Sequence, residues 1–164
     1  MKELPAERKE GAKSLYLDAD VWLNLIQREM AGFVPAFQRT KQLLSRAETE
    51  GWELVVSDLV KEEVRSQGVK EEDMKRQISG LREKKLVKHA QVKEADREKA
   101  REILRSRGLH FSDALHVAVA LRNESHLVTR NMRHFSVVDD LLEVSRPESL
   151  LQGLEVAYKS TEDK

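Results

Sequence analysis

Apolar residues in this chain follow two different spacings, and both recur along its length. Short, nearly continuous apolar runs are typical of buried strands, whereas apolar residues three and four positions apart are typical of helices that bury one face. The first spacing predicts five strands, at residues 15–17, 52–56, 86–92, 126–129 and 141–145. The second predicts helices at residues 21–26, 34–50, 58–67, 70–85, 94–107 and 113–121, and one that begins at Pro147.

Strands and helices that alternate in this way predict an α/β domain with a mostly parallel sheet. The helix at 113–121 is apolar on nearly every side, so we expect it in the centre of the domain, with Ser112 as its cap. Residues 1–13 and 158–164 are expected to be flexible tails of a single domain at 14–157. Ligand sites in such sheets lie beyond the carboxyl ends of the strands.

The composition excludes several classes of protein. The chain has 164 residues, the size of one ordinary domain, and no cysteine, which excludes disulfides, zinc fingers, iron–sulfur clusters and thiol nucleophiles. No apolar stretch approaches the roughly 20 residues that span a membrane, and the first residues lack the apolar run of a signal peptide. We therefore expect a cytoplasmic protein that has no membrane partner.

Polar side chains follow the predicted strands at the edge where ligands usually bind. Asp18 comes directly after the first strand, and Thr129 and Asn131 lie at the end of the fourth. Asp113 opens the central helix, where the helix dipole also favours a carboxylate. Each residue has an alternative interpretation as a turn or cap residue. Their convergence on one edge of a parallel sheet favours a shared site.

Glu63 differs from its neighbour Glu62 in the direction in which it points. Leu59, Val60 and Val64 mark the inward face of the helix that carries both acids. At about 100° per residue, Glu63 falls on that face and Glu62 falls away from it. An inward carboxylate is costly unless it is paired or binds a metal, so Glu63 is the candidate ligand and Glu62 is a solvated residue.

Carboxylates gathered at one edge of the sheet indicate a metal site. Asp18, Glu63 and Asp113 would repel one another, and each would raise the pKa of the others in the absence of a counter-ion. Oxygen ligands suit a hard divalent cation such as Mg²⁺ or Mn²⁺. Such a cation activates water and stabilises the charge that develops on a phosphate, which is the chemistry of phosphodiester hydrolysis.

Five segments of the chain resemble, in the same order, the PIN-domain ribonucleases, the fold used by VapC-type toxins. They are LYLDADVWLNL at 15–25, VVSDLVKEEV at 55–64, HFSDALHVAVAL at 110–121, LVTRNMRHF at 127–135 and EVSRPESLL at 143–151. The third and fourth segments are the most specific. The resemblance implies a three-layer α/β/α fold around a central, mostly parallel sheet of about five strands.

The resemblance also implies roles for single residues. The three acids of the family map to Asp18, Glu63 and Asp113, which would bind Mg²⁺ or Mn²⁺ directly or through water. A fourth acidic position of the family falls on Asn131. The amide removes one negative charge and weakens the case for a second metal ion, although it can still orient a ligand water.

Three neighbouring residues have secondary roles or none. Thr129 is expected to support the site by hydrogen bonding, and Asp20 either compensates in part for Asn131 or caps the following helix. His116 lies one turn after Asp113. A single histidine without a partner motif is more often a core residue hydrogen-bonded to the backbone, so we do not assign His116 to catalysis.

By resemblance the function is that of a metal-dependent endoribonuclease, which is expected to form a homodimer. In a VapBC-type toxin–antitoxin pair, an antitoxin protein would hold it inactive. Three alternatives stay open: an RNA-processing nuclease without an antitoxin, a catalytically weak scaffold that binds RNA or protein, and a structure-specific DNA nuclease. Asn131 and the charged middle of the chain motivate the scaffold, whereas 164 residues leave little room for the insertions of the DNA nuclease.

Basic and acidic residues balance overall, at 29 each, but not locally. Residues 61–107 carry 15 basic and 10 acidic side chains, whereas the segments on either side are both net acidic. This basic excess either covers solvated helical faces or forms a rim that positions a phosphate backbone beside the acidic pocket. Arg130, Lys93 and Arg101 are the candidate contacts for the RNA substrate.

Overall fold

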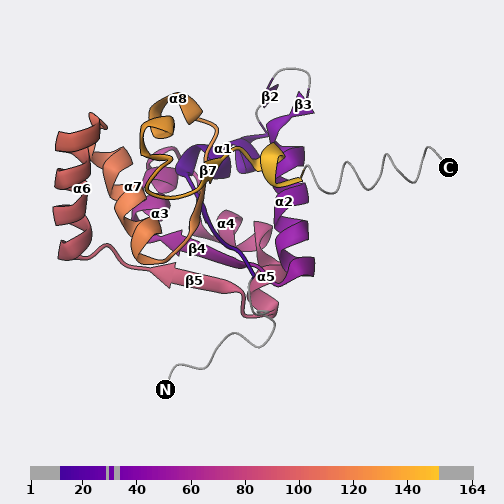
Figure 1. Cartoon of the computed structure of the whole chain (residues 1–164). Helices are drawn as coiled ribbons and strands as arrows, with labels where there is room; N and C mark the ends of the chain where they lie inside the picture. The colour runs from indigo at the N-terminus through magenta and orange to yellow at the C-terminus, as the bar shows by residue number, and fades with distance from the viewer. Residues whose placement is uncertain (1–11, 29, 32–33, 152–164) are drawn as a thin grey trace.

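The computed structural model describes residues 12–28, 30–31 and 34–151, and its centre is a five-stranded sheet (Figure 1). The strands stand in the order β5-β4-β1-β6-β7, and every neighbouring pair is parallel. Their bounds are β1 (Ser14–Leu17), β4 (Glu53–Ser57), β5 (Val87–Ala90), β6 (His126–Val128) and β7 (Val144–Ser145). Each overlaps a strand that the apolar runs predict, and the α/β class is confirmed.

Helices fill the connections between these strands. They are α1 (Ala19–Gln27), α2 (Ala36–Glu50), α3 (Asp58–Ser66), α4 (Glu71–Gln77), α5 (Ser79–Glu83), α6 (Glu94–Arg107), α7 (Phe111–Arg122) and α8 (Met132–Phe135). Two 3₁₀ turns, η1 (Ser136–Val138) and η2 (Pro147–Leu151), and a small hairpin of β2 (Met30–Ala31) and β3 (Val34–Pro35) complete the described chain. None of the described helices combines the length and the apolar character that a membrane span requires.

The sheet lies between two groups of helices, which gives the three layers that the resemblance implies. Figure 1 shows α2 on one side of the strands and α6 and α7 on the other. All four residues of β1 are buried, as are the seven consecutive residues Ala114–Ala120 of α7. The helix α7 contacts β6 and packs along α6, so its apolar surface is covered on several sides. The prediction of a central helix is therefore confirmed.

Two helices differ from the predicted spans for local reasons. Residues 70–85 form α4 and α5 rather than one helix, because Ile78 leaves the helical region at φ −118° while its side chain stays in the core. The predicted helix at 34–50 begins only at Ala36. Pro35 disfavours a helical conformation at Val34, and both residues belong to β3 instead.

Other predicted boundaries were also wrong or lie outside the description. Ser112 is not a cap, because α7 already begins at Phe111, after an extended His110. The segment from Pro147 is a 3₁₀ helix over its described length. The C-terminal tail, the boundary at 157 and all but two residues of the N-terminal tail fall outside the described residues. The short helix α8 was not predicted, since its sequence contains no apolar run.

The strand order places the site at the centre of one edge. The chain passes from β1 to β4 and β5 on one side, and later forms β6 and β7 on the other. The carboxyl ends of parallel strands share one edge, and open α/β sheets bind ligands where the strand order reverses. Asp18 follows β1, Thr129 follows β6 and α3 follows β4, so their side chains belong to that edge.

Candidate metal centre

Two acids and one histidine meet at the carboxyl ends of the central strands. Asp18 follows β1, Glu63 lies on α3 and His116 lies on α7. His116 Nε2 is 2.9 Å from Glu63 Oε2 and 3.7 Å from Asp18 Oδ1. One ligand atom of each residue lies within 4.8 Å of the other two. Across the part of the chain that the structure describes, this trio is the one such group of potential metal ligands, and we call it the acid–histidine cluster.

Both carboxylate oxygens of Asp18 accept hydrogen bonds that fix the side chain. Asp18 is the N-cap of α1, and its Oδ1 accepts from Ala19 N at 2.8 Å. Its Oδ2 accepts from Thr129 Oγ1 at 3.0 Å, and the same threonine oxygen accepts from Asn131 N at 3.0 Å. A carboxylate has about four lone-pair positions, so these bonds leave capacity for a further ligand. Capping and metal binding are therefore compatible at this residue.

The helix α3 presents Glu63 to the cluster and Glu62 to solvent. Ser57 begins this arrangement, because its Oγ accepts from Val60 N at 3.1 Å and caps the helix. Glu63 is half-buried, with 34% of its side chain exposed, and contacts His116. Glu62 is exposed and forms an ion pair with Arg65 on the surface.

His116 is buried, as expected of a core histidine, but its partners are side chains and not the backbone. Its Nδ1 lies 2.7 Å from the hydroxyl oxygen of Tyr16, which in turn lies 2.7 Å from Ser57 Oγ. Sequence reasoning left His116 outside the site, whereas the structure places it in the cluster. The available signal was its position three residues after Asp113, one helical turn along α7.

Burial and crowding perturb the ionisation of the cluster. Burial raises the pKa of Asp18, against the lowering effects of His116 and of the hydrogen bonds from Thr129 and Ala19. Burial by itself would lower the pKa of His116, but the hydrogen bond to Glu63 and the nearby carboxylate charges raise it above its usual value. Both pKa shifts favour the protonated forms, so a divalent cation that binds here would replace those protons.

Asp20 lies beside the cluster with one oxygen unpaired. Its Oδ2 accepts from Arg130 N at 3.2 Å, whereas its Oδ1 is buried and has no hydrogen-bond partner among the described residues. Burial and the charge of Asp18 raise the pKa of Asp20 to about 7. A buried carboxylate oxygen without a donor is a costly feature that a nearby cation would relieve.

The guanidinium of Arg130 is directed away from solvent. It donates to Ala36 O at 3.2 Å and pairs with Glu148 at 2.6 Å, and 12% of the side chain is exposed. Arg130 therefore connects the start of α2 with η2. Its charge is already balanced by Glu148, so it is less suited to the predicted contact with an RNA phosphate.

Asp113 and Asn131 lie near His134 and outside the acid–histidine cluster. His134 Nδ1 is 3.5 Å from Asp113 Oδ2 and 2.8 Å from Asn131 Nδ2. Asp113 still contributes to the electrostatics, because its charge helps to raise the pKa of His116. Of the four predicted site residues, the structure brings Asp18 and Glu63 together and places the other two around His134.

The remaining basic candidates lie immediately before α6 and on its surface. Lys93 precedes the first turn of α6, and Arg101 pairs with Glu94 at 3.6 Å on its surface. Several other basic side chains of α4 and α6 also pair with nearby acids on their own helices, as in Arg76–Asp73 and Lys99–Glu102. These pairs are typical of solvated helical faces.

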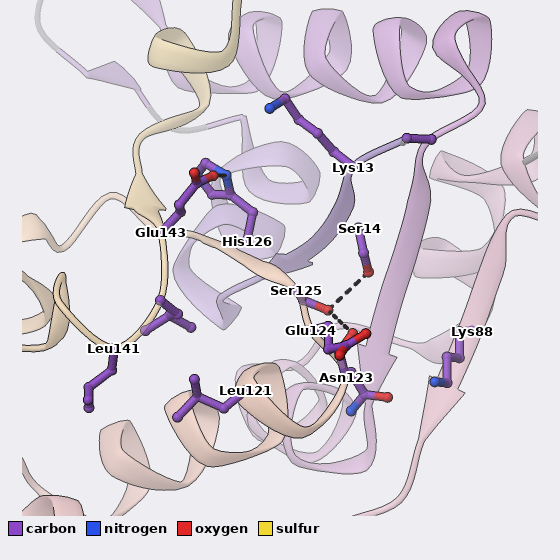
Figure 2. Close-up of a pocket in the computed structure, with 12 residues that line it drawn as sticks. Lys13, Ser14, Lys88, Leu121, Asn123, Glu124, Ser125, His126, Leu141 and Glu143 are labelled. Atoms are coloured by element: carbon purple, nitrogen blue, oxygen red, sulfur yellow. Dashed lines mark hydrogen bonds and ion pairs between the residues drawn. The ribbon is translucent and has the colours of Figure 1, made fainter. Parts of the chain in front are cut away.

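A cavity of about 540 Å³ lies at the opposite ends of the same strands (Figure 2). Its lining includes Ser14 and His126, the first residues of β1 and β6. Ser14 Oγ donates to the Glu53 carboxylate at 3.2 Å and lies 3.0 Å from Ser125 Oγ, so much of the polar lining is bonded internally. Because the cavity lies at the amino ends of the strands, it is separate from the acid–histidine cluster at their carboxyl ends.

The acid–histidine cluster fits a bound divalent cation better than it fits a nucleophilic side chain. Its donors are two carboxylates and one imidazole, which together suit first-row divalent ions. It contains no cysteine, and the hydroxyl group that contacts His116 belongs to the buried Tyr16. A protein nucleophile is therefore not indicated at this site. Asp18, Glu63 and His116 are the residues that can hold the ion, with Asp20 next to them.

Comparison with known proteins agrees with this geometry. A family model of the PIN domain matches residues 15–141, which is most of the chain. The chain belongs to the PIN domain family. PIN domains are generally nucleases that use divalent metals, so the family and the cluster indicate the same class of chemistry. No curated protein sequence matches the chain.

Several solved structures share the PIN fold with this chain. A toxin–antitoxin complex from Klebsiella pneumoniae contains a chain that is 18% identical, with a TM-score of 0.55, and the match covers 81% of this chain and 97% of that one. VapBC2 from Rickettsia felis, bound to a DNA fragment from its promoter, is 16% identical over 81% and 98% of the two chains, with a TM-score of 0.57. FitAcB from Neisseria gonorrhoeae is 17% identical over 81% and 97%, with a TM-score of 0.53. At these identities the matches establish the fold alone.

Proposed function

We propose that this PIN domain is a metal-dependent endoribonuclease that hydrolyses RNA phosphodiester bonds with Mg²⁺ or Mn²⁺. The observation that carries the proposal is the acid–histidine cluster at the point where the strand order reverses. A divalent cation bound there supplies a Lewis acid that activates water and stabilises the charge on the phosphate.

The protein's own residues hold and orient the components of this site. Asp18 and Glu63 provide the charge that retains the cation, and Thr129 keeps the Asp18 carboxylate in place through its hydrogen bond of 3.0 Å. Asp113 and Asn131 lie at the adjacent rim around His134, where they are positioned to orient water or a phosphate oxygen rather than to join the cluster directly.

We further propose that the protein is the toxin of a VapBC-type pair, acts in the cytoplasm as a homodimer, and is held inactive by an antitoxin protein. Support comes from the shared fold with chains of toxin–antitoxin complexes. Expression of the wild-type chain in bacteria should be toxic, and Asp18→Asn should relieve the toxicity. Harmless expression of an active nuclease would favour an RNA-processing role without an antitoxin.

Cleavage of a labelled single-stranded RNA by the purified chain tests the nuclease. Activity should require Mg²⁺ or Mn²⁺ and disappear with EDTA. Asp18→Asn and Glu63→Gln should each lower the rate by about 100-fold or more, because each removes part of several kcal/mol of charge stabilisation.

Glu62→Gln is the matched control for Glu63→Gln, since the two acids are adjacent on α3 but Glu62 pairs with Arg65 at the surface. It should retain nearly the wild-type rate. Equal cleavage by Asp18→Asn and the wild type would show that the nuclease assignment is wrong.

The rival function is a scaffold that binds RNA without cleaving it. Asn131 in place of a fourth acid, together with its contact to His134, favours this alternative. A chain that binds RNA in a gel-shift assay, but shows neither cleavage nor any response to Mn²⁺, would support the scaffold.

A further inference from the structure

The imidazole of His116 is part of the cluster, although sequence reasoning assigns the metal to oxygen ligands alone. Its side chain is 1% exposed, and its Nε2 is directed toward both carboxylates. A buried histidine beside two acids has two physical explanations. It either pairs with the carboxylates as a cation, or it joins them as a nitrogen ligand to a shared ion.

The spacing of the donor atoms is compatible with a shared ion as well as with the hydrogen bond between His116 and Glu63. Two atoms that each lie about 2.1 Å from an ion stand about 3.0 Å apart at adjacent octahedral positions and about 3.4 Å apart at tetrahedral positions. His116 Nε2 lies 2.9 Å from Glu63 Oε2 and 3.7 Å from Asp18 Oδ1. Both separations are close to these values, and the ligand oxygens of Asp18 and Glu63 lie within 4.8 Å of each other, so one ion can bind all three side chains once they move slightly inward.

The other ring nitrogen has the partner that metal-binding histidines require. A histidine that binds metal through one nitrogen generally donates its other N–H to a fixed acceptor, which sets the tautomer and the ring orientation. His116 Nδ1 lies 2.7 Å from the Tyr16 hydroxyl, which itself lies 2.7 Å from Ser57 Oγ. A hydroxyl both donates and accepts, so Tyr16 can satisfy Nδ1 whether or not that nitrogen carries the proton.

We propose that His116 Nε2 is a direct nitrogen ligand of the catalytic metal, and that Tyr16 and Ser57 hold its ring in position. The inference rests on the proposed metal-dependent function and goes beyond the oxygen-only site of Asp18, Glu63 and Asp113. Imidazole suits transition ions better than Mg²⁺, so the site should bind Mn²⁺ and Co²⁺ more tightly than Mg²⁺.

Pulsed electron paramagnetic resonance of bound Mn²⁺ tests the proposal without relying on activity. Coordination by imidazole produces nitrogen modulation of the Mn²⁺ electron spin echo. The wild-type chain should show this modulation, and His116→Gln should lose it while its circular dichroism spectrum stays native.

His134→Gln is the matched control, because His134 is the nearby histidine beside Asp113 and Asn131. It should keep the modulation. Modulation that disappears in His134→Gln and persists in His116→Gln would place the ion at the rim and overturn the proposal.

Tyr16→Phe provides a second variant that retains the buried ring and loses one hydroxyl. It should keep the nitrogen modulation but weaken Mn²⁺ binding by about 10-fold to 100-fold, as is usual when the outer partner of a ligand is removed. Unchanged affinity in a folded Tyr16→Phe would overturn the positioning role of Tyr16.

The outcomes also separate this inference from the proposed function. If Mn²⁺ binds and supports cleavage but the wild type shows no nitrogen modulation, His116 is an ion-pair partner, and the inference fails while the nuclease stands. If Mn²⁺ does not bind at all, both fail.

Discussion

The carboxylate of Asp18 shows how one residue serves the fold and the site together. It caps α1 through Ala19 N at 2.8 Å, accepts from Thr129 at 3.0 Å and lies 3.7 Å from His116 Nε2. Asp20, two residues later, has one paired and one unpaired oxygen. Burial raises the pKa of Asp20, and the nearby charge of Asp18 raises it further, so the charged form of Asp20 is disfavoured in the folded chain.

The raised pKa of Asp20 predicts a pH dependence of stability in the protein from which metal has been removed with EDTA. The pKa of Asp20 is about 7 in the folded state and 3.8 as a free side chain, so the folded state binds the proton more tightly. The free energy of unfolding should therefore fall as pH rises from about 4 to 7, by up to about 4 kcal/mol. Asp20→Asn should flatten this slope in urea unfolding measured with EDTA.

Asp139→Asn provides the control, because Asp139 is exposed and lies outside the cluster. It should keep the wild-type slope. A slope that is identical in Asp20→Asn and the wild type would show that the titration of Asp20 does not cause this pH dependence.

At the scale of elements, a buried ion pair joins α7 to the start of α6. Asp96 is 2% exposed and accepts from Arg122 Nε at 2.8 Å and from Arg122 Nη2 at 3.0 Å. Its Oδ2 also accepts from Lys93 N at 2.8 Å, which caps α6. Arg122 reaches Gln91 O at 2.7 Å as well. The pair therefore fixes the C-terminal end of α7 against the first turn of α6.

Removal of Arg122 should leave the charge of Asp96 buried without its partner. Arg122→Met, which keeps most of the apolar stem, should lower the free energy of unfolding by about 3 kcal/mol in urea denaturation. Arg101→Met breaks an exposed pair with Glu94 on the same helix α6 and should cost less than about 1 kcal/mol. Equal losses in the two variants would contradict a structural role for the Arg122–Asp96 pair.

At the scale of the molecule, the acid–histidine cluster brings together parts of the chain that are far apart in sequence. Asp18 follows β1, Glu63 lies on α3, which contacts β4, and His116 lies on α7, which contacts β6. An ion bound to all three holds these elements together, and it stabilises the folded chain because the unfolded chain cannot bring the ligands together.

Saturating Mn²⁺ should therefore raise the melting temperature of the whole domain. At 100 times the dissociation constant the gain is about 2.7 kcal/mol, which corresponds to roughly 5–10 °C for a domain of this size. Asp18→Asn should lose most of the shift in differential scanning fluorimetry. Asp58→Asn, at an exposed position on α3, should keep it. A shift retained by Asp18→Asn would place the ion elsewhere.

Local patterns in the sequence predicted the elements and part of the site. The alternation of apolar runs and helical spacing predicted five strands in an α/β fold, since each spacing reports which face of an element is buried. The 100° rotation per residue separated Glu63 from Glu62 for the same reason. Gly51 and Gly108 directly follow α2 and α6 and adopt positive φ, at 72° and 74°, where residues with side chains are strained, so glycine suits both helix ends.

Only the tertiary structure decided which side chains meet. His116 looked like a core residue because burial is visible in a local pattern and a partner 100 residues away is not. Its contacts with Tyr16 and Glu63 exist because β1 pairs with β4 and because α7 packs close to both strands' ends. The same long-range packing placed Asp113 beside His134 rather than in the cluster. The sequence by itself thus determined the class of fold and pointed to two of the acids, and strand pairing with helix packing decided which side chains form the acid–histidine cluster.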